Sequence, residues 1–229
     1  MMHLLPYLQH LLSGLSITLV LMIASVGTGL LLAIFLTIGS LSNYFFIKTP
    51  TEFLIFFIRG TPLLVQLFLI YYGLGQFEWI RYSVMWVILG KPMACAIITL
   101  SLNTACYTSI LLKGAIHSVP KSEIAACEAL GMSRWLALRR IIFPRAFRIA
   151  MPAYSNEVII VLKCTSLAST ITLLDLMGVT QQLITETYDT VSLYILAGVI
   201  YLALNGVIMG LFKILNRWSQ IPGRYSRGY

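Results

Sequence analysis

Two charged side chains stand inside one long apolar segment, residues 153–177. A charge at the centre of a bilayer costs about 2.5–3.5 kcal/mol, so Glu157 and Lys163 each need a partner. The carboxylate of Glu157 offers a counter-charge to a cationic ligand in a medium of low dielectric constant. Because six residues of α-helix rotate the chain by about 600°, the two side chains lie about 120° apart. We therefore expect their partners on other segments, unless the helix is irregular.

Three more polar side chains, Arg59, Gln66 and Asn103, fall inside neighbouring apolar segments. Together with Glu157 and Lys163, they are expected to line the pathway of a polar solute. Two alternatives are open for this group. The first is a structural polar network between helices, and the second is extension of the cations to the membrane surface. The position of Arg59 near the expected inner face favours a structural role for that residue.

The composition indicates a helical membrane protein. The chain is 59% hydrophobic and 10% charged, with a mean hydropathy of +0.87, whereas about a quarter of a soluble domain is charged. The apolar residues form runs of roughly twenty, which is the length that a helix needs to cross a hydrocarbon core. Short alternating segments typical of outer-membrane barrels do not occur in the sequence. The first apolar run is too long for a secretory signal.

We predict an all-α membrane protein with five transmembrane helices in one domain, residues 1–229. Lysine and arginine concentrate in residues 113–150, here called the basic segment, and in the C-terminal tail. The positive-inside rule assigns both to the cytoplasm, with the N-terminus outside and the C-terminus inside. This distribution explains the net charge of +8, and no nucleic-acid partner is expected. The expected helices are 14–38, 53–72, 92–112, 153–177 and 191–215, with loops at 39–52, 73–91 and 178–190.

The basic segment is expected to hold two short helices. The first begins at Pro120, with Ser122 as its cap and Glu123 in its first turn, and ends at Gly131. An arginine-rich second helix then follows, capped by Ser133 and ended by Pro144. A slim helix of small residues can enter a groove on a partner protein. The alternative is a basic amphipathic stretch lying on anionic lipid.

This segment resembles the EAA loop of permease subunits of bacterial ABC importers. Residues 125–131 and 141–144 carry the resemblance, with a glycine, an isoleucine and a proline at the family's intervals. The sequence departs from the pattern at Ala125, where the family has glutamate, at Cys127, where it has alanine, and at Phe143, where it has leucine. The resemblance implies docking on an ATP-binding subunit through Ser122, Glu123, Ala125, Ala126, Glu128, Ala129, Leu130, Gly131 and Pro144.

The resemblance extends over nearly the whole chain. Residues 59–66, 101–107 and 154–167 are similar to segments of polar-amino-acid permeases, the last of them to histidine- and arginine-type members. It implies two ATP-binding subunits, a second permease, a periplasmic amino-acid-binding protein and contact with membrane lipid. The partners would hydrolyse ATP, and no cofactor is expected in this chain, whose sequence has no GxxxxGK[ST] run and no metal-ligand spacing.

We therefore expect a permease subunit, not an enzyme, in the bacterial inner membrane. It would carry basic amino acids such as arginine, histidine or lysine by alternating access. The alternatives are a permease for a neutral amino acid such as glutamine, an ion-coupled secondary transporter, and a scaffold without transport. Buried polar residues disfavour the scaffold, and an odd number of spans disfavours a duplicated secondary transporter. Asp175, Glu186 and Asp189 are expected to face solvent or the binding protein.

Overall fold

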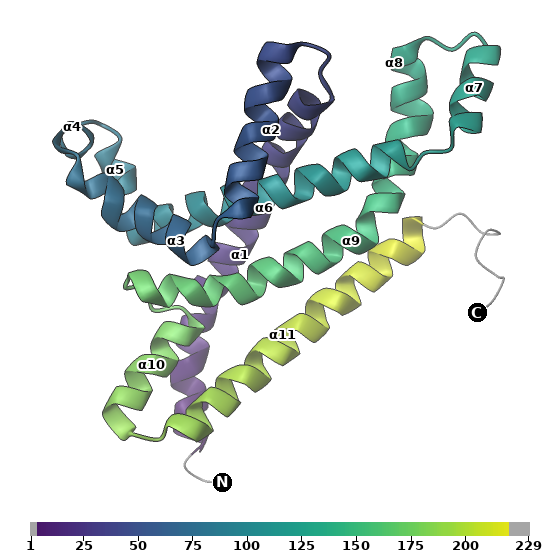
Figure 1. Ribbon diagram of the computed structural model, residues 1–229. Helices are drawn as coiled ribbons and strands as arrows, with labels where there is room; N and C mark the ends of the chain where they lie inside the picture. Colours follow the sequence, from purple (N-terminus) through teal and green to yellow (C-terminus); the bar gives the residue numbers. More distant parts are fainter. Residues whose placement is uncertain (1–3, 220–229) are drawn as a thin grey trace.

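The computed structural model describes residues 4–219, and every regular element in that range is a helix (Figure 1). A π-helical turn covers Leu69–Gly73, with a 3-10 turn after it at Leu74–Gln76. A second π turn covers Leu138–Ile142, and a 3-10 helix covers Thr165–Ile171. The α-helices are α1 (Leu4–Leu41), α2 (Phe45–Gly60), α3 (Leu63–Phe68), α4 (Glu78–Arg81), α5 (Trp86–Leu89), α6 (Pro92–His117), α7 (Lys121–Ala129), α8 (Arg134–Ala137), α9 (Phe143–Cys164), α10 (Leu176–Thr187) and α11 (Thr190–Ser219).

Three helices, α1, α6 and α11, are each long and apolar enough to cross a membrane. Two further spans are bent pairs of helices. The segment Leu63–Gln76 follows α2 at an angle of 105°, and α10 follows the segment Arg134–Ile171 at 49°. Counting each bent pair as one span gives five, in agreement with the number expected from the sequence.

The expectation of one continuous second span over 53–72 is wrong. The helix α2 begins at Phe45, eight residues earlier, includes Pro50, and ends at Gly60. Thr61 and Pro62 then take extended backbone conformations before α3 starts. A residue that precedes proline is disfavoured in the α region, which explains why the helix stops here. The expected loops 39–52 and 73–91 are also largely helical, because α2 starts inside the first and α4 and α5 lie in the second.

The expected fourth span and the loop after it also differ from the structure. Instead of running from 153 to 177, helical structure begins before α9 and ends at Thr172, whose φ of 70° is left-handed. The helix α10 then occupies most of the expected loop 178–190. Its cap is Asp175, whose Oδ1 accepts a hydrogen bond from the Gly178 amide at 3.0 Å.

In the basic segment, Pro144 does not end a helix. It lies in the first turn of α9, directly after the π turn, where its missing N–H group costs least. Ser122 is not a cap either, because α7 begins at Lys121 with Pro120 before it. The predicted cap at Ser133 is confirmed, since its side chain accepts a hydrogen bond from the Leu136 amide at 3.3 Å.

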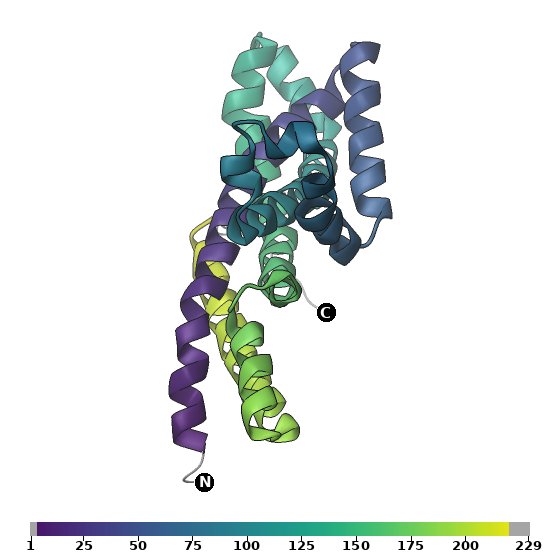
Figure 2. The ribbon, with the colours of Figure 1, turned by 90° about the vertical axis from the view of Figure 1, so that its left-hand side faces the viewer.

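Small residues let the long helices approach closely. At Gly29 of α1, an added methyl group would collide with the side chain of Thr104 on α6. The main buried cluster joins α1 through Leu21 to α6 through Cys95 and Ala96. Seen from the side, α1 extends along the length of the molecule (Figure 2). Helices α7 and α8, residues 121–137, project as an arm at the end where α6 finishes and α9 begins (Figure 1).

Candidate functional site: a polar row along one membrane helix

Glu157 is buried at the contact between α9 and α6, with 7% of its surface exposed. Its Oε1 accepts a hydrogen bond from the Thr104 hydroxyl at 3.1 Å. Within residues 4–219, no salt bridge joins this carboxylate to a cation. The partner expected for Glu157 therefore lies on another span, but it is a hydroxyl group, which no feature of the sequence singles out. A carboxylate in this setting can still attract a cationic solute.

Gln66 and Asn103 form a second polar contact, at the bend between α2 and α3. The Gln66 amide donates to the Ile58 carbonyl at 2.6 Å and to the Thr61 carbonyl at 3.0 Å. In a continuous helix the Ile58 carbonyl would accept from residue 62, but Pro62 has no N–H group to give. The Gln66 side chain thus replaces a missing backbone donor. The Asn103 side chain of α6 donates to the side-chain oxygen Oε1 of Gln66 at 3.1 Å and connects the bend to α6.

The two cations of the predicted pathway lie apart from each other. The guanidinium carbon of Arg59 is 5.0 Å from the centre of the Tyr107 ring on α6, which is a cation–π distance. Lys163 is exposed and makes no salt bridge with Glu157 in the part of the chain that the structure describes. It lines a cavity of about 280 Å³ together with Ser166, Met177, Tyr194, Ala197, Gly198 and Tyr201.

Most of the residues predicted to line the pathway therefore contact residues 103–107 of α6. Gln66 contacts Asn103, Glu157 contacts Thr104, and Arg59 lies over Tyr107. Lys163 lies outside this row, beside α10 and α11. The positions 103 and 107 are one helical turn apart, which places their side chains on the same face of α6. One helix thus holds polar groups from α2, α3 and α9.

The arm presents most of the predicted docking residues to solvent. Gly131 has a φ of +70°, and the amide of Met132 bonds to the Cys127 carbonyl at 3.0 Å, which completes a Schellman cap. Glu123 forms a salt bridge of 2.8 Å with Arg145, so α7 is tied to the first turn of α9. The exposed members of the predicted set are Ser122, Ala125, Ala126, Glu128, Ala129, Leu130 and Gly131, while Glu123 and Pro144 are half-buried.

One acidic residue expected at the outer surface is instead in the core. Asp175 is fully buried, and its Oδ2 accepts a hydrogen bond from the Tyr201 hydroxyl at 3.5 Å. Glu186 is exposed, and Asp189 is partly exposed, as expected. Among residues 4–219, no three His, Cys, Asp or Glu side chains come together as a metal site.

Bent membrane spans, a buried polar row and a projecting helical arm together define a helical transport component of a membrane. The chain belongs to the family described as the binding-protein-dependent transport system inner membrane component, whose model matches residues 25–220. It is thus an inner-membrane protein, in agreement with the location expected from the sequence.

Characterised relatives match along most of their length. The chain is 45% identical over 214 residues to the octopine transport system permease protein OccM of Rhizobium radiobacter, covering 93% of this chain and 87% of the relative. It is 42% identical over 209 residues to the nopaline transport system permease protein NocM of Agrobacterium fabrum, covering 91% and 87%. It is 41% identical over 211 residues to the arginine ABC transporter permease protein ArtM of Haemophilus influenzae, covering 92% of each.

Solved structures share the fold. An amino acid ABC transporter crystallised with histidines superposes with a TM-score of 0.85 at 30% identity, covering 94% of this chain and 97% of the other. The MetNI methionine ABC transporter in an inward-facing conformation superposes with a TM-score of 0.76 at 16% identity, covering 94% and 99%. The second likeness concerns the fold alone.

Proposed function

We propose that this chain is the permease subunit of an ATP-driven importer for basic amino acids such as arginine, histidine or lysine, with the cationic side chain as the feature recognised. The names of its relatives, which transport arginine, octopine or nopaline, support a substrate of this kind. So does the transporter crystallised with histidines. A neutral amino acid, ion-coupled uptake and a scaffold role find no comparable support.

The observation that carries this proposal is the buried carboxylate of Glu157. Its only side-chain hydrogen bond in the described structure comes from Thr104, a neutral donor. A cationic amino acid that passes this point would supply the missing positive charge. The exposed ammonium group of Lys163, on the same helix, would attract the substrate carboxylate. These two residues would thus favour a solute that carries both charges.

The arm would connect the permease to its source of energy. Two ATP-binding subunits would each dock on an arm, one from this chain and one from a second permease of identical or related sequence. A periplasmic binding protein would deliver the amino acid on the opposite side. ATP hydrolysis, and the nucleotide it requires, would belong to the partners, so this chain would act in transport without an ATPase site or cofactor of its own.

Transport would then proceed by alternating access. Movement of the ATP-binding subunits would displace the arm, and the spans would expose the polar row first to one side and then to the other. Ser122, Glu123, Ala125, Ala126, Glu128, Ala129, Leu130, Gly131 and Pro144 would form or support the docking surface, while Arg59, Gln66, Asn103, Glu157 and Lys163 would border the pathway.

The experiment is uptake by the whole complex in proteoliposomes, with ATP inside and loaded binding protein outside. Arginine, histidine, lysine and glutamine are compared, each with and without a proton ionophore. We expect ATP-dependent uptake of the basic amino acids that survives the ionophore. Glu157→Gln should impair this uptake more than it impairs assembly. Preferential uptake of glutamine, or uptake driven by the proton gradient without ATP, would contradict the proposal.

A further inference from the structure

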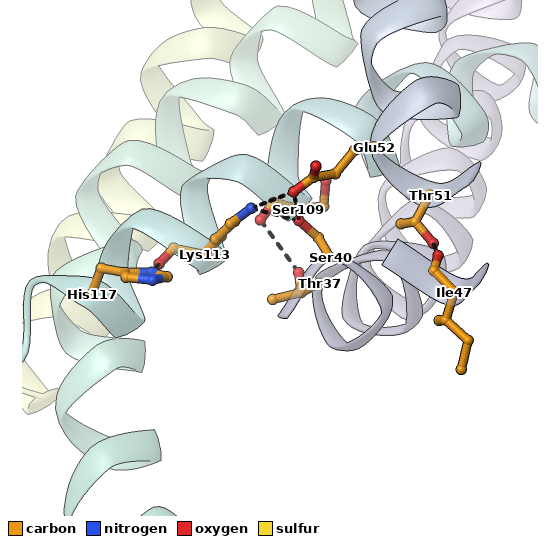
Figure 3. Close-up of polar contacts among 8 residues, drawn as sticks. All are labelled: Thr37, Ser40, Ile47, Thr51, Glu52, Ser109, Lys113 and His117. Atoms are coloured by element: carbon orange, nitrogen blue, oxygen red, sulfur yellow. Dashed lines mark hydrogen bonds and ion pairs between the residues drawn. The ribbon is translucent and has the colours of Figure 1, made fainter. Parts of the chain in front are cut away.

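A polar joint connects three helices close to the arm. The Lys113 ammonium group on α6 donates to Glu52 Oε1 on α2 at 3.0 Å and to the Ser40 hydroxyl on α1 at 2.7 Å (Figure 3). Ser40 donates to the same carboxylate oxygen at 3.4 Å. The side chains of Lys113 and Glu52 are 33% and 43% exposed, so the pair is only partly shielded from solvent. We call Ser40, Glu52 and Lys113 the joint.

The joint is the polar attachment of the first half of α2. The buried residues of this helix, Ile55 and Ile58, lie in its second half, where they pack around Cys106 of α6. Before Glu52, residues 45–50 are all exposed, and Thr51 lies against Gly39 of α1. Among the described residues, Glu52 forms the one salt bridge made by α2. The position of this half of the helix therefore depends strongly on the joint.

The helices α1 and α6 contact each other closely next to the joint. The single hydroxyl proton of Thr37 on α1 is shared between two acceptors, the Ala33 carbonyl of its own helix at 2.7 Å and the Ser109 carbonyl of α6 at 3.3 Å. Figure 3 shows the contact with Ser109. Thr37 precedes Ser40 by three residues and Ser109 precedes Lys113 by four, which is about one helical turn in each case. Since α1 and α6 already contact each other here, the Lys113–Glu52 pair is the contact that attaches α2 to these two helices.

Lys113 also lies next to the arm. It is four residues from the end of α6 at His117, and only residues 118–120 separate α6 from α7. The arm is tied to α9 by the salt bridge between Glu123 and Arg145. A displacement of α7 can thus reach α6 through a three-residue connection, and at Lys113 it meets α2.

At its other end, α2 leads directly into the bend at the polar row. Gln66 follows Pro62 and donates back to the Ile58 and Thr61 carbonyls that precede it, while Asn103 of α6 donates to Gln66. The bend is therefore stiff, and α2 with α3 would move as one body. A continuous series of covalent connections and hydrogen bonds therefore leads from the arm to the polar row. It passes through the last turn of α6, the joint and α2.

We propose that Glu52 and Lys113 are positioning residues that transmit movement of the arm to the bent span α2–α3. The inference rests on the proposed function, because it requires that docking partners move the arm. An ion pair suits this role, since it holds two helices at a fixed distance while its partial exposure keeps its contribution to folding small. Neither residue needs to touch the substrate.

The test measures transport and ATP hydrolysis together, in the complete complex in proteoliposomes. The variants are Glu52→Gln, Lys113→Gln, and the exchange Glu52→Lys with Lys113→Glu. We expect each single variant to assemble and hydrolyse ATP, but to move about fivefold fewer substrate molecules per ATP, the lower end of typical coupling between sites. The exchange should recover most of the lost ratio. Glu78→Gln in α4 and Lys91→Gln, directly before the first residue of α6, serve as controls because both residues are exposed and lie outside the joint.

Three outcomes would overturn the inference. The first is an unchanged ratio of transport to hydrolysis in the single variants. The second is an exchange variant no better than the single variants, and the third is a loss of transport explained entirely by a lower yield of complex. Failure of the proposed function would look different, because the unmodified complex would then not transport basic amino acids. If it carried another amino acid, the same ratio measured with that substrate would still test the joint.

Discussion

The Thr104 hydroxyl on α6 donates a hydrogen bond of 3.1 Å to the Glu157 carboxylate on α9. Both residues are buried, so this contact lies between two membrane helices rather than at a surface. Four residues further along α6, the Thr108 hydroxyl is also buried but has no hydrogen-bond partner. The two threonines therefore form a natural pair for measuring what the contact with Glu157 contributes.

We expect Thr104→Val to destabilise the complex by about 0.5–2 kcal/mol, because it keeps the shape of the side chain and removes the donor to Glu157. It should also change the apparent affinity for arginine, since the carboxylate loses the group that orients it. Thermal unfolding in detergent and uptake at varied arginine concentrations measure the two effects. Thr108→Val should be neutral or stabilising, because no hydrogen bond is lost there. Equal effects at 104 and 108 would contradict this account.

Pro62→Ala should reduce the bend between α2 and α3. The substitution restores an N–H group that can donate to the Ile58 carbonyl and removes the restriction on Thr61. We expect a longer distance between spin labels at the exposed positions Phe53 and Leu69, measured by pulsed electron paramagnetic resonance without the native cysteines.

The control for this experiment is Pro50→Ala, because Pro50 lies within α2, which continues through it without a break. The distance between the two labels should stay the same in that variant. Transport should fall only for Pro62→Ala, since only this change alters where α3 holds Gln66. An equal distance in both variants would show that another feature sets the bend.

Gly131→Val should abolish most transport while leaving membrane insertion intact. The left-handed φ of +70° costs a residue with a Cβ atom about 1–2 kcal/mol, and more when that residue is branched. The end of α7 would then shift, although nothing within 4 Å of Gly131 blocks a side chain. Gly131→Asn is the matched variant, because asparagine tolerates this conformation. Transport by Gly131→Asn should stay well above that of Gly131→Val in the same vesicles.

Asp175→Ala should destabilise the protein by about 1–2 kcal/mol through loss of the cap of α10. Asp175→Asn keeps an oxygen for the Gly178 amide and should recover much of this loss. Asp189→Ala, whose bond to the Ser192 amide is longer at 3.4 Å and partly exposed, should have a smaller effect. Thermal unfolding of the three purified variants ranks them. A ranking with Asp189→Ala as the least stable would refute the assignment.

Hydropathy alone predicted the number of spans, because each lipid-crossing segment must be apolar along its length. It could not reveal the breaks inside two of them. Apolar residues continue on both sides of Pro62, so the second span reads as continuous despite the proline. The left-handed Thr172 has no signature at all, since threonine rarely adopts that conformation. At Pro144 the error is the reverse, because the sequence predicts the end of a helix there. In the structure a π turn precedes this proline, and helical structure continues through it.

The candidate site was predictable in its charges but not in its contacts. Glu157 and Gln66 are conspicuous because polar groups are costly in a bilayer. Thr104 is not, since threonine hydroxyls commonly bond to the carbonyl one turn earlier in their own helix. Glu52 and Lys113 fall at the boundary of two expected loops, 39–52 and 113–150. Only their distance in space shows that they pair.

The hydrogen bonds of Gln66 have a consequence for how the permease can move. Because one side chain supplies the donor that Pro62 lacks, a hydrogen bond within the chain itself supports the angle of 105°. We expect the second span to move as one bent unit, since the residues without helical structure at its two ends are 42–44 and Phe77. Opening and closing of the pathway would then tilt the bent second span without straightening it.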